Sequence, residues 1–151
     1  MKKPEDRHRP PMTKGENMRR IKSKNTRPEM LVRRILRSLG YIGYRLHRKD
    51  ILGCPDIAFI GRKKVIFVHG CFWHGHDCKV GIRKPKSNQD YWLPKIERNR
   101  NRFVNYVEAL QAEGWNILTI WECQLKNVAD LSVKLEKFMN GNAGSSEYQQ
   151  D

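Results

Sequence analysis

Apolar residues recur at two periods along the chain, and these periods predict its helices and strands. Over residues 30–39 they come every three or four positions, which is the spacing of one helix face. Thr26 or Asn25 is suited to cap the start of this helix, and Gly40 to end it. The other predicted elements are strands at 41–46, 57–60 and 65–68, a helix from 91 or 92 to about 113, a strand at 116–121 and a helix at 131–139.

This order of elements predicts a mixed α/β domain over residues 18–139, with a central sheet flanked by helices. A basic turn at 61–64 is expected to join two of the strands as a hairpin. Residues 1–17 are rich in Pro and basic groups, which is typical either of a flexible basic arm or of an inert disordered terminus. Residues 140–151 are small and polar and predict a disordered tail.

The charge of the chain narrows the class of partner. Thirty Lys and Arg residues against sixteen Asp and Glu give a formal charge of +14. Such an excess favours polyanions: DNA, RNA or an anionic membrane surface. A membrane-spanning protein is not indicated, because no apolar run approaches the roughly 20 residues that a bilayer requires. The N-terminus also lacks the apolar middle of a signal peptide, so a cytoplasmic protein is expected.

A dense Cys/His loop predicts a metal site. Two thiolates and an imidazole from one loop, with a third thiolate from a distant strand end, suit tetrahedral zinc in a structural role. The alternative is that some of these cysteines are buried apolar residues. Cys54 is more typical of a small packed residue than of a ligand. The four proposed zinc ligands are Cys71, His76, Cys78 and Cys123.

Catalytic candidates surround one predicted hairpin. Asp56 precedes an apolar strand, and His69 lies just past the end of the paired strand. A lone aspartate is often only a solvated turn residue, but here it offers a hard oxygen ligand for Mg²⁺, the ion that activates water for phosphodiester hydrolysis. His74 is suited to move a proton near pH 7, while His69 and Glu29 could hold metal-bound waters. The alternative role of Glu29 is a favourable interaction with a helix dipole.

Large aromatic residues stand among polar neighbours in two places. Phe72 and Trp73 lie in the Cys/His loop, and Trp92 precedes a basic helix. Core packing is the ordinary alternative, and we expect it for Trp115 and Trp121. Aromatic side chains that enter a base stack kink the duplex at a cost of about a few kcal/mol per step, and a mismatched pair lowers that cost. These aromatics therefore give a physical route to mismatch selectivity.

Five runs of residues carry a resemblance to a known family. The runs NMRRIKSKNTRPE, GCPD, FVHGCFWHGHDC, YWLPKIERN and GWNILTIWEC resemble the very-short-patch repair (Vsr-type) endonucleases over about residues 13–137. The resemblance implies a PD-(D/E)xK restriction-endonuclease-like fold with a structural zinc. It implies Mg²⁺-dependent nicking of double-stranded DNA on the 5′ side of the thymine in a T:G mismatch, which arises when 5-methylcytosine deaminates. It also implies a nucleoid-associated prokaryotic protein that acts as a monomer and that a MutL-type repair protein can assist.

The resemblance assigns roles position by position. Asp56 matches the magnesium-binding aspartate, and Val68 matches a residue that ligates the metal through its carbonyl. His74 matches the catalytic histidine, while His69 and Glu29 match groups that hold metal-bound waters. The implied zinc ligands are those already named. The implied DNA-contacting residues are Phe72, Trp73 and Trp92 as intercalating aromatics, Met18 and Ile21 at the minor groove, and Arg19, Lys95 and Asn99.

Three positions depart from the family pattern. Val68 has no hydroxyl, which matters little if only its carbonyl binds. Cys54 replaces a commoner Arg, so the nearby DNA contact of the family is not carried over to this chain, and Phe103 stands where an Asp is usual, which bears on hydrogen bonding or sequence preference. Two alternatives follow: a nuclease of the same fold that acts on another mismatch or a restriction-like site, and a zinc-stabilised DNA-binding module that no longer cleaves.

Overall fold

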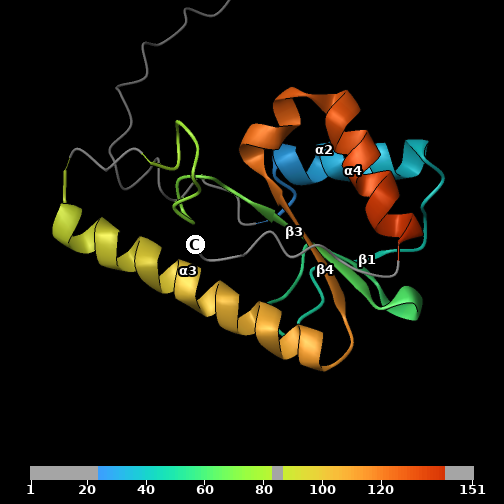
Figure 1. The fold of residues 1–151 in the computed structure, drawn as a ribbon, viewed down its shortest axis with the longest axis horizontal. Coiled ribbons are helices and arrows are strands. Elements are labelled where there is room, and N and C mark those ends of the chain that lie inside the picture. Colours follow the sequence, from blue (N-terminus) through green and yellow to red (C-terminus); the bar gives the residue numbers. More distant parts are fainter. Residues whose placement is uncertain (1–23, 83–86, 142–151) are drawn as a thin grey trace, which may run out of the picture.

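The computed structural model describes residues 24–82 and 87–141 (Figure 1). The predicted N-terminal arm, the residues Met18, Arg19 and Ile21, and the chain beyond 141 lie outside this part. The described helices are α2 (Arg27–Ser38), α3 (Gln89–Ala112) and α4 (Val128–Asn140), and the strands are β1 (Arg45–Leu46), β2 (Ile57–Phe59), β3 (Lys64–His69) and β4 (Asn116–Trp121). Short 3-10 turns, η1 (Ile60–Arg62) and η2 (Glu122–Lys126), follow β2 and β4.

The four strands form one mixed sheet in the order β1-β2-β3-β4. The β1–β2 and β2–β3 pairs are antiparallel, whereas β3 and β4 are parallel. The parallel pair requires a long crossover, and α3 supplies it between the two strands. Figure 1 shows α2 and α4 on one side of the sheet and the long α3 on the other. The predicted α/β architecture with a central mixed sheet is therefore confirmed.

Both faces of the sheet are buried, because the side chains of β3 alternate between two apolar clusters. Ile66 packs with α2 and α4, while Val65 and Phe67 pack with α3. A strand that is covered on both faces reads as a continuous apolar run, as 65–68 does. The sheet is thus held from both sides, and its strand ends are fixed where polar side chains follow.

The first predicted strand is much shorter than expected. Residues 41–46 were predicted as a strand, but only Arg45 and Leu46 pair with β2. Gly40 and Gly43 adopt positive φ angles of 88° and 86°, which bend the chain before pairing begins. The prediction counted apolar residues and overlooked the second glycine.

The ends of the other elements differ from the predictions by a few residues. The strand predicted at 57–60 ends at 59, and the strand predicted at 65–68 runs from 64 to 69. Helix α3 begins at Gln89. Helix α4 begins at Val128 because Asn127 caps it, its side chain accepting from the Asp130 N–H at 3.1 Å, and it includes Asn140, which was assigned to the tail.

Lys64 was predicted to lie in a turn. This prediction is wrong, because Lys64 is buried and is the first residue of β3. Its Nζ donates hydrogen bonds to the carbonyl oxygens of Phe138 at 2.7 Å, Met139 at 2.7 Å and Gly141 at 2.6 Å. These carbonyls lie at the C-terminal end of α4, where helix carbonyls lack intrahelical partners and the dipole favours a cation. Lys64 therefore fastens the last helix to the sheet.

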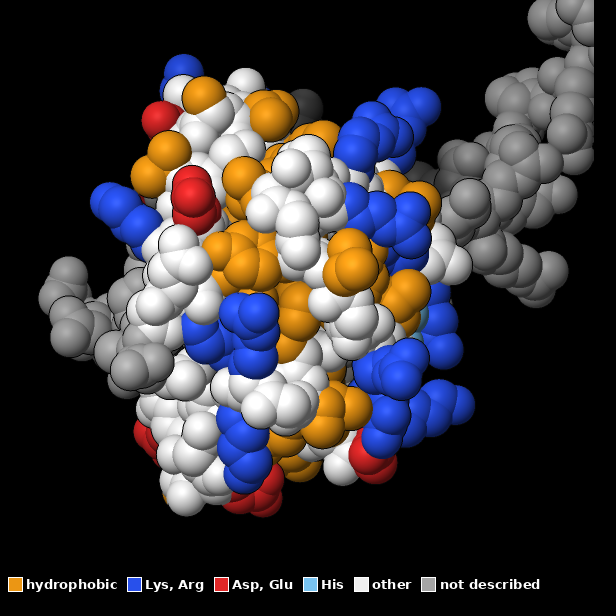
Figure 2. Space-filling model, turned by 90° about the vertical axis from the view of Figure 1, so that its right-hand side faces the viewer, with side chains coloured by type: hydrophobic (Ala, Val, Ile, Leu, Met, Phe, Trp, Pro, Cys, Tyr) orange, Lys and Arg blue, Asp and Glu red, His pale blue; other side chains and the backbone are white. Residues whose placement is uncertain are grey.

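Basic side chains outnumber acidic ones on the face that Figure 2 shows. Figure 2 shows Lys and Arg side chains spread around exposed apolar ones on one face, with fewer Asp and Glu. Over residues 24–82 and 87–141, no helix combines the length and the apolar character needed to cross a membrane.

We predict that Lys64→Met lowers the free energy of unfolding by about 2–3 kcal/mol, because three carbonyls lose a charged donor. Urea denaturation followed by circular dichroism measures this loss. Lys63→Met is the matched control, since Lys63 is exposed and donates to a single carbonyl, that of Glu113, at 2.8 Å. The control is expected to lose less than about 1 kcal/mol. Equal losses in the two variants would contradict the capping role.

Candidate active site and metal centre

Asp56 lies directly before β2, at the edge of a pocket of about 360 Å³ that also receives His69 and His74. Its Oδ2 accepts a hydrogen bond from the Val68 N–H at 2.7 Å. Burial raises the pKa of this carboxyl to about 7, opposed by the Val68 hydrogen bond and reinforced by the charge of Glu29. Near neutral pH the carboxyl therefore holds its proton weakly, and a bound cation would favour the ionised form. The predicted meeting of this carboxylate with the two imidazoles is present.

The two imidazoles stack face to face. The rings of His69 and His74 have centroids 3.8 Å apart and planes 3° from parallel. Burial lowers the pKa of His74 to about 4, and burial together with His74 lowers the pKa of His69 well below its usual value. Both rings are therefore neutral at pH 7. Within the described part of the chain, the buried Nδ1 atom of each ring has no hydrogen-bond partner. A neutral imidazole with an unused nitrogen can accept a proton.

Glu29 is buried in the first turn of α2 and belongs to a second group of polar side chains. The Asn25 N–H donates to its Oε2 at 2.9 Å, and Arg33 Nη2 lies 3.3 Å from the same oxygen. His47 Nε2 is also 3.3 Å from that oxygen, and His47 Nδ1 is 3.9 Å from Asp56 Oδ1. Glu29 therefore lies in the first turn of α2, where the helix dipole favours an anion, and also beside His47 and Asp56.

Sequence reasoning missed His47, which it treated as part of a polar connection. Only the register of the β1–β2 pair shows that His47 lies near Asp56. Leu46 pairs with Ile57 in the antiparallel β1–β2 ladder, so the next residue, His47, lies opposite Asp56. The sequence does not determine the register in which β1 pairs with β2, so the position of His47 opposite Asp56 could not be predicted from it.

Helix α3 supplies one wall of the pocket. Asn99, Arg102, Phe103 and Tyr106 line it, at positions i, i+3, i+4 and i+7 of the helix, which share one face. Tyr106 was not singled out from the sequence, although its spacing from Asn99 and Phe103 was a usable signal. Arg102 places a cation on this wall of the pocket.

The three departures from the family pattern have defined places. Val68 contributes its backbone N–H to Asp56, so its apolar side chain does not disturb that contact. Phe103 is buried and packs edge-on against His69, with centroids 4.3 Å apart, so the pocket has an apolar wall there instead of a carboxylate. Cys54 is exposed at the pocket mouth, so the expectation that it is a packed residue is wrong, and its backbone is left-handed, with φ of 49°.

The predicted zinc ligands meet at the other side of the loop that follows β3. The ligand atoms of Cys71, His76, Cys78 and Cys123 all lie within 4.8 Å of one another. Tetrahedral zinc holds its sulfur ligands about 3.8 Å apart, so the spacing fits. Burial raises the pKa of the Cys71 thiol to about 12, and a thiolate there needs a bound cation. Hydrogen bonds from backbone N–H groups reach Cys78 Sγ from Gly81 at 3.3 Å and Cys71 Sγ from Cys123 at 3.4 Å.

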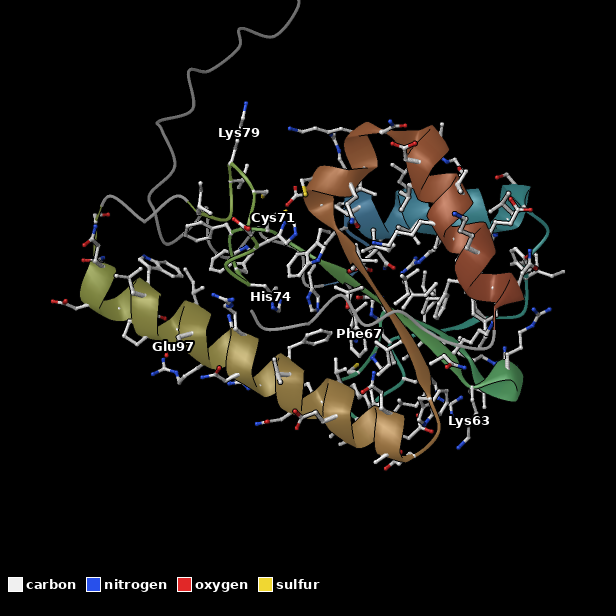
Figure 3. The ribbon with its side chains drawn as sticks, viewed as in Figure 1. Lys63, Phe67, Cys71, His74, Lys79 and Glu97 are labelled. Atoms are coloured by element: carbon white, nitrogen blue, oxygen red, sulfur yellow. The ribbon has the colours of Figure 1, made fainter. Side chains whose placement is uncertain are left out.

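Trp121 joins the cysteine cluster to the pocket. Its ring stacks on His76 with centroids 4.1 Å apart, and it meets His69 edge-on at 5.3 Å. Trp121 is buried, as predicted for a core residue. Figure 3 shows Cys71 and His74 on the same loop, between the end of β3 and α3. Because Trp121 contacts both His76 and His69, an ordered cysteine cluster also helps to fix the position of the His69 ring.

The aromatic residues beside the pocket pack against one another. The rings of Phe72 and Trp73, and those of Trp73 and Trp92, have centroids 5.3 Å apart, and all three side chains are half-buried. Lys95 Nζ lies 5.3 Å from the ring centroid of Trp92 and 5.9 Å from that of Trp73. Asn99 Nδ2 donates to the Trp73 carbonyl at 3.2 Å. The three aromatics thus form one cluster with a cation beside it, rather than part of the main core.

The amino-acid sequence is similar to those of known proteins. The family model described as "DNA mismatch endonuclease Vsr" matches residues 5–80. A "Type II nicking enzyme V.XorIIP" from Xanthomonas oryzae pv. oryzae is 51% identical over 123 residues, which cover 82% of this chain and 89% of the relative.

Two further relatives extend the comparison. A "Type II nicking enzyme V.NmeAIP" from Neisseria meningitidis is 43% identical over 122 residues, covering 81% of this chain and 86% of the relative. The "DNA mismatch endonuclease Vsr" of Escherichia coli K12 is 33% identical over 140 residues, covering 89% of this chain and 88% of the relative. The chain therefore belongs to the Vsr family and is a DNA endonuclease.

Proposed function

We propose that this endonuclease nicks one strand of double-stranded DNA on the 5′ side of the thymine in a T:G mismatch, by Mg²⁺-dependent hydrolysis, and so begins very-short-patch repair of deaminated 5-methylcytosine. One observation carries the proposal: a single carboxylate, Asp56, shares a pocket with two stacked neutral imidazoles in a chain of the Vsr family. The relatives named as nicking enzymes support cleavage of one strand.

The donor atoms of the pocket fit a magnesium ion. Asp56 Oδ1 is free of the Val68 hydrogen bond, which uses Oδ2, and the Val68 carbonyl is the second proposed ligand. Carboxylate and carbonyl oxygens are the ligands that Mg²⁺ prefers. When bound, Mg²⁺ supplies a Lewis acid that polarises the phosphodiester and makes water a stronger nucleophile.

Other side chains then accept the proton, orient water and bind the phosphate. His74 is the general base that accepts a proton from the attacking water; burial keeps its ring neutral at pH 7 and also makes it a weaker base than a free imidazole. His69 and Glu29 orient water by hydrogen bonds. Arg102, on the α3 wall, is placed to bind the phosphate being cleaved. The new bond joins the water oxygen to phosphorus, and the bond to the leaving oxygen breaks.

The aromatic cluster beside the pocket supports mismatch recognition. Phe72, Trp73 and Trp92 are already packed together, so insertion into the duplex requires little ordering of these side chains. A T:G pair stacks less firmly than a matched pair, so it is cheaper to unstack. Lys95 and Asn99 are the proposed polar contacts beside the wedge. Met18, Ile21 and Arg19, proposed to approach from the minor groove, lie outside the described residues.

The cysteine cluster is proposed to hold a structural zinc ion, since three thiolates and one imidazole match the ligands of closed zinc sites. We further propose that the enzyme acts as a monomer on DNA in the cytoplasm and that a MutL-type repair protein assists it. The excess of basic side chains favours the DNA contact.

We predict that the wild-type enzyme nicks a labelled T:G duplex 5′ to the thymine in Mg²⁺ and not in EDTA. Asp56→Asn is expected to lower the nicking rate by at least about 100-fold, because it removes the anionic ligand, while duplex binding in Ca²⁺ persists. Gel electrophoresis of the labelled thymine strand measures the rate, and fluorescence anisotropy measures binding.

Asp50→Asn is the matched control for this assay, since Asp50 is exposed and forms an ion pair with Arg48, at 2.7 Å from its Nε. Its nicking rate is expected to stay within about twofold of wild type. Matched duplexes and other mismatches in several sequence contexts complete the panel. Binding without a nick would favour a non-cleaving module, and faster cleavage of another duplex would favour a different substrate.

We predict that the purified protein carries one equivalent of zinc and that Cys123→Ser loses most of it, because a thiolate ligand is removed. Elemental analysis by mass spectrometry measures the zinc, and thermal denaturation is expected to show a lower Tm. Cys54→Ser is the control, since this cysteine is exposed and lies outside the cluster. Undiminished zinc in the Cys123 variant would exclude the assigned ligand set.

A further inference from the structure

We propose that His47 is a nitrogen ligand of the divalent ion that Asp56 binds. The inference rests on the proposed function in one respect only: it takes Asp56 as a carboxylate ligand of that ion. It adds a residue that neither the sequence nor the family resemblance singled out. It also changes the chemistry of the site, from oxygen ligands alone to a mixed nitrogen and oxygen set.

The imidazole of His47 lies between two carboxylates. Its Nε2 is 3.3 Å from Glu29 Oε2, and its Nδ1 is 3.9 Å from Asp56 Oδ1. One ligand atom from each of these three residues lies within 4.8 Å of the other two. Two ligands of one octahedral ion with bonds of about 2.1 Å stand about 3.0 Å apart when adjacent and about 4.2 Å when opposite. The Nδ1–Oδ1 distance falls within this range, so both atoms can bind one ion after a small movement.

The backbone aims this ring at the carboxylate. The His47 N–H donates to the Asp56 carbonyl at 3.4 Å, which extends the β1–β2 pairing by one residue. His47 also has a φ of 48°, in the left-handed region that non-glycine residues seldom occupy. Such a conformation is strained and persists where the surrounding structure requires it. Here it turns the side chain toward the site instead of toward the solvent.

The contacts of Nε2 decide which nitrogen is available. Arg33 Nη2 lies 3.1 Å from His47 Nε2 and 3.3 Å from Glu29 Oε2. In one tautomer Nε2 accepts from Arg33; in the other, Nε2–H donates to Glu29 and Nδ1 carries the lone pair that faces Asp56. A histidine that binds a metal usually donates its second ring N–H to a carboxylate. The bound ion therefore selects the second tautomer, with Glu29 as the supporting carboxylate and Arg33 balancing its charge.

A nitrogen ligand alters the choice of ion. Imidazole suits Zn, Cu, Fe and Ni, whereas carboxylate, carbonyl and water suit Mg²⁺ and Mn²⁺. With His47 as an added ligand, the site is expected to hold a divalent ion more tightly than Asp56 and the Val68 carbonyl alone. Mn²⁺ is therefore a suitable probe, because its electron spin also reports directly on nitrogen nuclei in its ligand sphere.

The test uses the full chain with zinc bound and no DNA, titrated with Mn²⁺. Electron spin-echo envelope modulation of the bound ion is expected to show coupling to a histidine ¹⁴N nucleus in wild type. His47→Asn is expected to lose this modulation and to raise the Kd for Mn²⁺ at least about tenfold. Asparagine is chosen because it tolerates the left-handed backbone. His74→Asn is the control and is expected to keep the modulation, while Asp56→Asn is expected to abolish specific Mn²⁺ binding.

Three results would overturn the inference: no specific Mn²⁺ binding to wild type, bound Mn²⁺ without nitrogen modulation, or modulation that survives in His47→Asn. The wild-type spectrum alone decides the first two, even if the variant fails to fold, and thermal melting checks the folding of each variant. The outcome is separable from that of the proposed function. An enzyme that nicks T:G duplexes without a nitrogen signal would refute only the ligand, and a nitrogen signal without nicking would refute only the function.

Discussion

The parallel pairing of β3 with β4 is the constraint on which the site depends. Its register places His69 opposite Trp121 at the ends of the two strands. Cys71 and Cys123 each follow two residues later, so the loop after β3 and the turn after β4 meet at the same edge of the sheet, and the Cys123 N–H donates to Cys71 Sγ. A slip of the pairing by one residue would turn every side chain of the strand to the opposite face and separate these groups.

The antiparallel hairpin of β2 and β3 adds the carboxylate to this edge. Asp56 is held by the Val68 N–H, and burial makes its ionised form unfavourable without a cation. The imidazoles beside it are neutral for the same reason, since burial disfavours their charged forms. The sheet thus places the Asp56 carboxyl, which loses its proton when a cation binds, next to neutral imidazoles that can accept a proton. Both properties come from burial, which the apolar wall at Phe103 completes.

Much of this arrangement could be predicted from the sequence, because it depends on local patterns. The 3.6-residue period predicted α2 and α3, and the spacing of the loop cysteines predicted a cluster that the structure brings together. Lys64 and His47 could not be predicted in the same way. The partners of Lys64 lie more than 70 residues away in α4, and the partner of His47 follows from the register of a two-residue strand. Pattern reasoning does not reach contacts of this kind, since they depend on tertiary packing.

The central claim is that the one carboxylate of the pocket brings a divalent ion to the phosphodiester on the 5′ side of a mismatched thymine. A crystal structure of the enzyme bound to an uncut T:G duplex with Ca²⁺ tests it most directly. The account predicts Ca²⁺ at about 2.4 Å from Asp56 Oδ1 and from an oxygen of that phosphate. A complex in which the phosphate lies outside the pocket of Asp56, His69 and His74, or in which no ion contacts Asp56, would contradict it.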